Sequence, residues 1–143
     1  MLIWFDAVVQ QASATGTRDD MLLRVEDLQV AFGATQVISG VDLAVAAGET
    51  LAIVGESGSG KSVTGLSIMG LLKRPLNVSA GSIHYQDQNL LKLAPRARRR
   101  LRGDRIAMIF QEPMTALNPV ASIGTQIAEM FVIHRGLDWP AAR

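Results

Sequence analysis

The chain has 143 residues, room for about one domain, and 48% of them are apolar, which is enough for a core. The formal net charge of +1 excludes a global field that would attract nucleic acid or an anionic membrane. The charge is uneven, because residues 1–56 hold two Arg and eight Asp/Glu (net −6), whereas residues 57–143 hold twelve Lys/Arg and five Asp/Glu (net +7). The absence of Cys excludes disulfides and thiolate metal sites, and His84 and His134 have no partners at metal-ligand spacing.

The first twenty residues form a separate segment. Residues 1–9 are apolar except for Asp6, and Ala12-Ser13-Ala14 resembles a signal-peptidase site. However, the front carries no positive charge, and the apolar run falls short of a membrane span. We therefore expect residues 1–20 to be a poorly ordered extension and residues 21–143 to form the domain. Translation from Met21 is an alternative that the sequence leaves open.

Strand-like alternation begins at Leu22. Apolar and polar residues alternate from Leu22 to Phe32, with a break in phase at Asp27, and again over residues 41–45. Gly33 and Ala34 form a turn signal between the two stretches. This pattern predicts two half-exposed antiparallel strands ahead of the following segment.

A short strand, a glycine-rich loop and a helix are predicted next. The apolar residues 51–54 are typical of a strand buried on both faces. Residues 55–62 fit the phosphate-loop pattern G-x-x-x-x-G-K-[ST]. Val63, Leu66, Met69 and Leu72 then have helical spacing. Strand before and helix after is the context that the pattern requires.

The residue types of this loop suit a polyphosphate. Its glycines allow backbone conformations in which successive N–H groups turn inward and form an anion nest, to which the start of the next helix adds its own N–H groups. Lys61 supplies a mobile charge for the β- and γ-phosphates, and Ser62 offers a hydroxyl to Mg²⁺. The alternative is an ordinary Gly/Ser-rich turn that happens to contain Lys-Ser.

Beyond the helix, Arg74-Pro75 should stop helical structure, and residues 81–85 have the pattern of another strand. A basic run follows, and two interpretations of it are open. It could contact nucleic acid, but no aromatic residues are interleaved with it for stacking. The favoured interpretation is a short solvated helix after Pro95. The run consists of Lys92, Arg96, Arg98, Arg99, Arg100, Arg102 and Arg105.

The last part of the chain resembles a strand, a shaped loop and a helix. Residues 105–110 have strand phasing, and Pro113 and Pro119 then rule out a regular element. Gln111, first after the strand, could reach Mg²⁺ or an attacking water, since ligands sit at strand ends of open α/β sheets. Ser122 is expected to cap a helix. On one face of that helix fall Ile123, Ile127, Met130, Phe131 and His134.

Phe32 stands directly before the turn. Its ring could lie flat on an adenine, or it could be a core or edge-strand residue, and the residues alone favour the second interpretation.

With both motifs in place, a family resemblance can be stated. The segment from Met21 to about His134 resembles the N-terminal half of an ABC transporter ATP-binding subunit. Residues 48–64 and 107–120 are similar to those of the oligopeptide/dipeptide importer group, which includes glutathione- and microcin-type importers. The resemblance implies an α/β fold with a P-loop NTPase core: an N-terminal antiparallel β-subdomain and an incomplete parallel sheet with helices.

The resemblance also implies roles for single residues. The loop would be the Walker A motif, which binds ATP with Mg²⁺, with Lys61 on the β/γ-phosphates and Ser62 on the metal. Gln111 would be the Q-loop glutamine that senses the γ-phosphate and Mg²⁺, and Phe32 would stack on adenine, which reverses the preference above. Val63 departs from the Ser/Thr common in the family, but its backbone N–H can still serve the α-phosphate. The implied nucleotide-binding residues are Phe32, Gly55, Glu56, Ser57, Gly58, Ser59, Gly60, Lys61, Ser62 and Val63.

Partners and location follow from the same resemblance. The loop that begins at Glu112 and ends at Pro119 would lie near the coupling helix of transmembrane permease subunits. A second ATP-binding subunit, peripheral attachment to the cytoplasmic face of the inner membrane and no nucleic-acid partner are expected. The signature motif, Walker B, the catalytic Glu and the switch-loop His are not found in this sequence, so hydrolysis is implied only for a complete domain.

We therefore expect a truncated or split reading frame, or a fragment. Two alternatives remain: a non-catalytic nucleotide-binding remnant, and an ABC-type ATPase that acts on nucleic acid. In related cores, further strands flank the strand before the loop. Without them residues 51–54 would have unpaired backbone groups, and we expect the isolated chain to be marginally stable or to aggregate.

Overall fold

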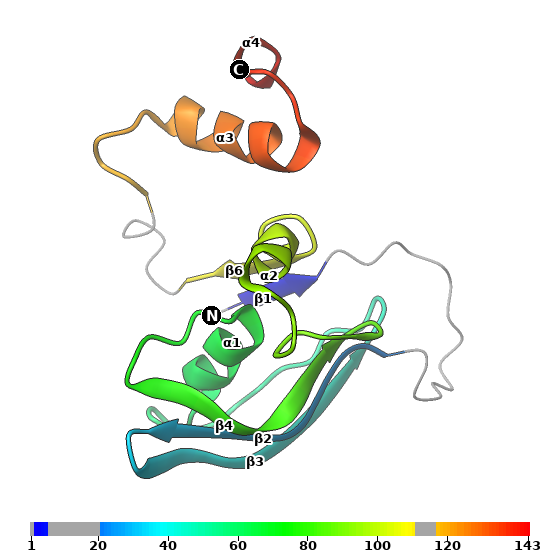
Figure 1. The fold of residues 1–143 in the computed structure, drawn as a ribbon, viewed down its shortest axis with the longest axis vertical. Coiled ribbons are helices and arrows are strands. Elements are labelled where there is room, and N and C mark those ends of the chain that lie inside the picture. The colour runs from blue at the N-terminus through cyan, green and yellow to red at the C-terminus, as the bar shows by residue number, and fades with distance from the viewer. Residues whose placement is uncertain (1, 6–20, 111–116) are drawn as a thin grey trace. The chain divides into compact units, whose positions relative to one another are not determined.

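The computed structural model describes residues 2–5, 21–110 and 117–143. The chain divides into two compact units. One unit is Ala7–Arg98, and the other combines Met1–Asp6 with Arg99–Arg143. Figure 1 labels the helices and strands of each unit.

A four-stranded antiparallel sheet forms the larger unit. Its strands are β2 (Met21–Phe32), β3 (Thr35–Ala46), β4 (Leu76–Tyr85) and β5 (Gln88–Asn89), in the order β3-β2-β4-β5. The predicted hairpin is confirmed, because β2 pairs antiparallel with β3 through the turn at Gly33. The central strand β2 carries much of the core. Its buried side chains are Leu22, Leu23, Val25, Leu28 and Val30.

A bulge at Asp27 explains the break in phase that the sequence showed. Asp27 has a positive φ of 43°, and the pairing of β2 with β3 shifts between Val25 and Leu28. The shift lets the side chains on both sides of the bulge, Val25 and Leu28, remain buried. On the other side of β2, Gly81 has φ +92°, and a Cβ there would collide with the backbone carbonyl of Asp27. The close approach of the two strands therefore requires glycine at position 81.

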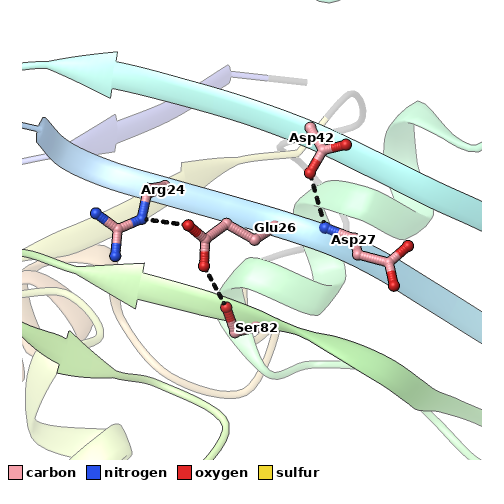
Figure 2. A network of polar contacts seen from close by, with 5 residues as sticks. All are labelled: Arg24, Glu26, Asp27, Asp42 and Ser82. Atoms are coloured by element: carbon pink, nitrogen blue, oxygen red, sulfur yellow. Dashed lines mark hydrogen bonds and ion pairs between the residues drawn. The ribbon is translucent and has the colours of Figure 1, made fainter. Parts of the chain in front are cut away.

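Polar contacts tie the bulge to both neighbouring strands (Figure 2). The backbone N–H of Asp27 donates to Asp42 Oδ1 at 2.8 Å, a contact with β3. On the β4 side, the Ser82 hydroxyl donates to Glu26 Oε2 at 3.0 Å, and Arg24 Nε lies 2.9 Å from Glu26 Oε1. On the β3 side, a carboxylate thus gives the backbone N–H of the bulge a partner, and on the β4 side a carboxylate links β2 to the Ser82 side chain.

Helix α1 (Lys61–Met69) lies over one face of this sheet (Figure 1). Its buried side includes Thr64, Ser67, Ile68 and Met69. The expected continuation through Leu72 to Arg74-Pro75 is wrong. Gly70 takes the left-handed conformation, and the backbone N–H groups at this cap bond to the carbonyls of Leu66 and Ser67, which ends the helix there.

The predicted buried strand at residues 51–54 is also wrong. These residues belong to no regular element, and Val54 is 89% exposed. A strand buried on both faces needs neighbours that bond its N–H and C=O groups, and within the described ranges no strand pairs with it. The two sheets formed by described residues are antiparallel throughout.

The basic run contains a short helix, α2 (Pro95–Leu101), as the favoured interpretation predicted. Arg96, Arg99 and Arg100 are exposed, and no residue of the helix is fully buried. Arg98 differs, because it is half-buried and its guanidinium donates to the Ser67 carbonyl at 3.4 Å, in the last turn of α1.

The smaller unit contains strands β1 (Leu2–Phe5) and β6 (Ile106–Ile109) and helices α3 (Ile123–Arg135) and α4 (Trp139–Ala142). The strand predicted over residues 105–110 is confirmed as β6. It pairs antiparallel with β1, in a part of the chain where the sequence predicted no strand.

Helix α3 begins as predicted. The Ser122 hydroxyl accepts a hydrogen bond from the backbone N–H of Thr125 at 3.2 Å, which caps the helix. None of the helices in the described parts of the chain is long and apolar enough to span a bilayer.

Candidate functional site

The phosphate-type loop adopts its bend through two left-handed glycines. Gly58 has φ +84° and Gly60 has φ +92°, and the backbone N–H of Ser59 closes a turn onto the Glu56 carbonyl at 3.2 Å. Gly60 is the N-cap of α1, and no side chain bonds to the first N–H groups of the helix. The N-terminal amides of α1, with the positive end of its dipole, are therefore available to an anion.

A buried residue of the sheet lies next to this loop. A Cβ placed on Gly60 would lie 3.4 Å from Cγ1 of Ile38, which is buried on β3. At the other end, the buried Thr64 is bonded to the carbonyl of Gly60 both by its N–H, at 2.8 Å, and by its hydroxyl, at 3.1 Å. The sequence analysis missed Ile38 and Thr64 as supports. Only their place in buried elements, beside the loop, could have indicated them.

The Lys61 side chain folds back over the loop. Its Nζ donates to the carbonyl oxygens of Gly55 at 2.7 Å and Glu56 at 2.6 Å, and to the hydroxyl of Ser59 at 3.0 Å. These contacts place a full positive charge beside the bend of the loop. A polyphosphate at the helix start would meet this charge and the helix amides together.

The described residues provide only part of a magnesium site. Ser62 is exposed at the first turn of α1, where its hydroxyl can face an ion carried by phosphates. No group of three His, Cys, Asp or Glu side chains that could hold a metal occurs among the described residues. Mg²⁺ commonly takes few protein ligands and completes its shell with water and phosphate oxygens, so this donor set suits a nucleotide-borne ion.

Phe32 ends β2 with its side chain 53% exposed, so its ring is not part of the core. It pairs with Thr35, three residues along β3 from the Ile38 that underlies the loop. At the rise of a β-strand, this separation is roughly 10 Å. Phe32 is thus about half exposed, at one end of the sheet that carries the loop.

The glutamine of the second motif and most of its loop lie outside the described residues, which exclude 111–116. The described end of the loop is held by Gln126 of α3. The carboxamide of Gln126 accepts from the Asn118 N–H at 2.9 Å and donates to the carbonyls of Asn118 and Ala121 at 3.1 and 2.9 Å. No sequence signal predicted this clamp, because a polar residue in an amphipathic helix is ordinarily solvated.

A separate cavity of about 430 Å³ lies at the other end of α1. Its lining includes Ser67 and Gly70 of the helix end, Leu76 and Val78 of β4, and Arg98. None of residues 55–62 lines it, so it is distinct from the phosphate-type loop.

Comparison with known proteins gives consistent matches. The family model described as ABC transporter matches residues 38–139. The chain is 50% identical over 120 residues to the probable peptide ABC transporter ATP-binding protein y4tR of Sinorhizobium fredii, a match that covers 80% of this chain and 36% of that protein. It is 48% identical over 119 residues to the dipeptide transport ATP-binding protein DppD of Haemophilus influenzae, with the same coverage of 80% and 36%.

A third relative is the oligopeptide transport ATP-binding protein AppD of Bacillus subtilis, 43% identical over 127 residues, which are 85% of this chain and 39% of that protein. The chain thus spans little more than a third of the length of these three relatives. The family match, however, covers well over half of the chain and includes the whole phosphate-type loop. The chain therefore belongs to the ABC transporter family.

Proposed function

We propose that the chain binds ATP with Mg²⁺ as part of the energy-coupling subunit of a peptide-type ABC importer. Membership of the family implies nucleotide binding, and the peptide-importer role goes beyond it. The observation that carries it is the loop at the start of α1, where uncapped helix amides and the Lys61 ammonium meet at one bend.

Different residues of the chain contact different parts of the nucleotide. Lys61 exchanges its loop oxygens for the β- and γ-phosphates, and the amides of the loop and of the first turn of α1 bind the remaining phosphate oxygens. Ser62 contributes its hydroxyl to the magnesium ion, which neutralises part of the phosphate charge when it is bound. Phe32 offers its exposed ring to the adenine. Gln111 is proposed to sense the γ-phosphate.

The transport role is inferred from the relatives, which are named as peptide, dipeptide and oligopeptide ATP-binding proteins. By analogy, the partners are transmembrane permease subunits, reached through residues 112–119, and a second ATP-binding subunit. The location is then peripheral, at the cytoplasmic face of the membrane. ATP hydrolysis is proposed for a complete domain, because a catalytic base and charge stabilisation from a second subunit are required.

Calorimetric titration of the chain with MgATP tests the binding proposal. Lys61→Ala should weaken binding at least about tenfold, because hydrogen bonds from a charged donor contribute about 1.5 kcal/mol or more. Lys73→Ala is the matched control, since Lys73 is an exposed lysine outside the loop, and it should leave the affinity unchanged. Equal affinities of wild type and Lys61→Ala would refute the assignment of the loop.

A further inference from the structure

The ammonium of Lys61 has a complete set of acceptors within the loop itself. An ammonium carries three N–H donors, and the three contacts at 2.6, 2.7 and 3.0 Å use all of them. All three acceptors belong to the same loop, at positions 55, 56 and 59. The Lys61 ammonium is therefore bound entirely by acceptors of the loop that it belongs to.

Only one of the three acceptors is a side chain. The carbonyls of Gly55 and Glu56 are fixed by the backbone, whereas the Ser59 hydroxyl can rotate. Its oxygen accepts from Lys61 and keeps its own proton for a second partner. The Ser59 backbone is anchored, because its N–H closes the turn onto the Glu56 carbonyl.

The glycine at position 55 makes room for this hydroxyl. A Cβ on Gly55 would lie 2.8 Å from Ser59 Oγ and 3.8 Å from Lys61 Nζ. The space that a side chain at position 55 would fill is thus the space in which the hydroxyl and the ammonium meet.

We propose that Ser59 is a positioning residue for Lys61: its hydroxyl holds the ammonium against the loop and gives up this hydrogen bond when a phosphate binds. The exchange with phosphate rests on the proposed function, whereas the hold on the lysine does not. Without the hydroxyl, the side chain of Lys61 keeps two acceptors and swings out of the loop more often. With it, the charge is already in place when a polyphosphate arrives, which lowers the conformational cost of binding.

The test is the rate at which acetic anhydride labels each lysine of the nucleotide-free chain, measured by mass spectrometry. Lys73 and Lys92 are exposed and serve as internal references. Ser59→Ala should raise the labelling of Lys61 relative to these references about fivefold, as expected when a partly exposed ammonium loses one hydrogen bond. Ser59→Thr, which keeps the hydroxyl, should restore the wild-type ratio. An unchanged ratio in Ser59→Ala would overturn the proposal.

A second serine of the loop provides the matched control. Ser57 is exposed and makes no hydrogen bond to Lys61 in the described loop, so Ser57→Ala should leave the labelling ratio unchanged. Equal increases in both alanine variants would show general loosening of the loop and would also overturn the role of Ser59.

MgATP added to the wild type separates the two proposals. Protection of Lys61 from labelling supports nucleotide binding. Absence of protection, with the Ser59→Ala effect intact, would remove the nucleotide function and leave the assignment of Ser59 standing.

Discussion

Residues 51–54 and residues 55–62 are adjacent in the chain, yet the structure gives the two segments opposite outcomes. The loop has left-handed glycines, as its sequence predicts, whereas the four apolar residues before it form no strand. The loop needs only its own residues, the helix that follows and the support of Ile38. A strand needs neighbours on both sides. Local chemistry thus specifies one segment, and distant pairing decides the other.

The largest effect is expected in the four-stranded sheet, whose strands do have pairing partners. Gly81→Ala would place a methyl group against the Asp27 carbonyl, at a left-handed position of β4. We expect a loss of about 3 kcal/mol or more in the free energy of unfolding, measured by urea denaturation followed by circular dichroism.

Gly33→Ala is the control for that variant. Gly33 is also left-handed, with φ +59°, but a Cβ there meets nothing within 4 Å. Its expected cost is about 1 kcal/mol, from backbone conformation alone. Similar losses in the two variants would show that contact across the bulge does not hold the sheet together.

The features that could be predicted from the sequence are likewise those that depend on neighbouring residues rather than on distant pairing. The hairpin, the break in phase at Asp27 and the cap at Ser122 were predictable, because alternation and turn or cap residues depend on residues close by in the chain. The pairing of β1 with β6 was not predictable, because it joins segments about a hundred residues apart. The full length of β4 was also missed. Its first residues, Leu76 to Ala80, do alternate between apolar and polar types, so the signal of a strand was present in the sequence and only residues 81–85 were recognised.

In the candidate site, the motif indicated Lys61 and Ser62 but not their surroundings. A pattern of letters carries no information on Ile38, which contacts the loop only because β3 passes beneath it. The hydrogen bonds between Gln126 and Asn118 could not be predicted either, because they depend on how α3 packs against the loop that precedes it.

The next largest effect is expected for Arg98, which contacts α1, the helix that follows the loop, from a distant part of the sequence. Arg98 donates to the Ser67 carbonyl, and its guanidinium lies where a Cβ on Gly70 would be. A cation at a helix C-terminus also interacts favourably with the helix dipole. Arg98→Ala should therefore cost about 1 kcal/mol of stability in the same urea assay.

Arg99→Ala removes the neighbouring arginine, which is exposed, and should change stability by less than about 0.5 kcal/mol. Comparison of the two variants separates the stability contributed by an arginine that contacts α1 from that contributed by a solvated arginine of the basic run. Equal losses would mean that net charge, rather than the contact with α1, sets the effect.

The smallest expected effect bears directly on residues 51–54. Val54 is 89% exposed, so Val54→Ser should change the free energy of unfolding of this chain by less than about 0.5 kcal/mol. It should also reduce aggregation, measured by light scattering, because it makes an exposed apolar run more polar. If Val54 were packed in a strand, the same change would cost about 2 kcal/mol, because it would remove buried apolar surface and leave a hydroxyl without a partner. A loss of that size would mean that these residues find a pairing partner in solution, and that the contrast between strand and loop does not hold.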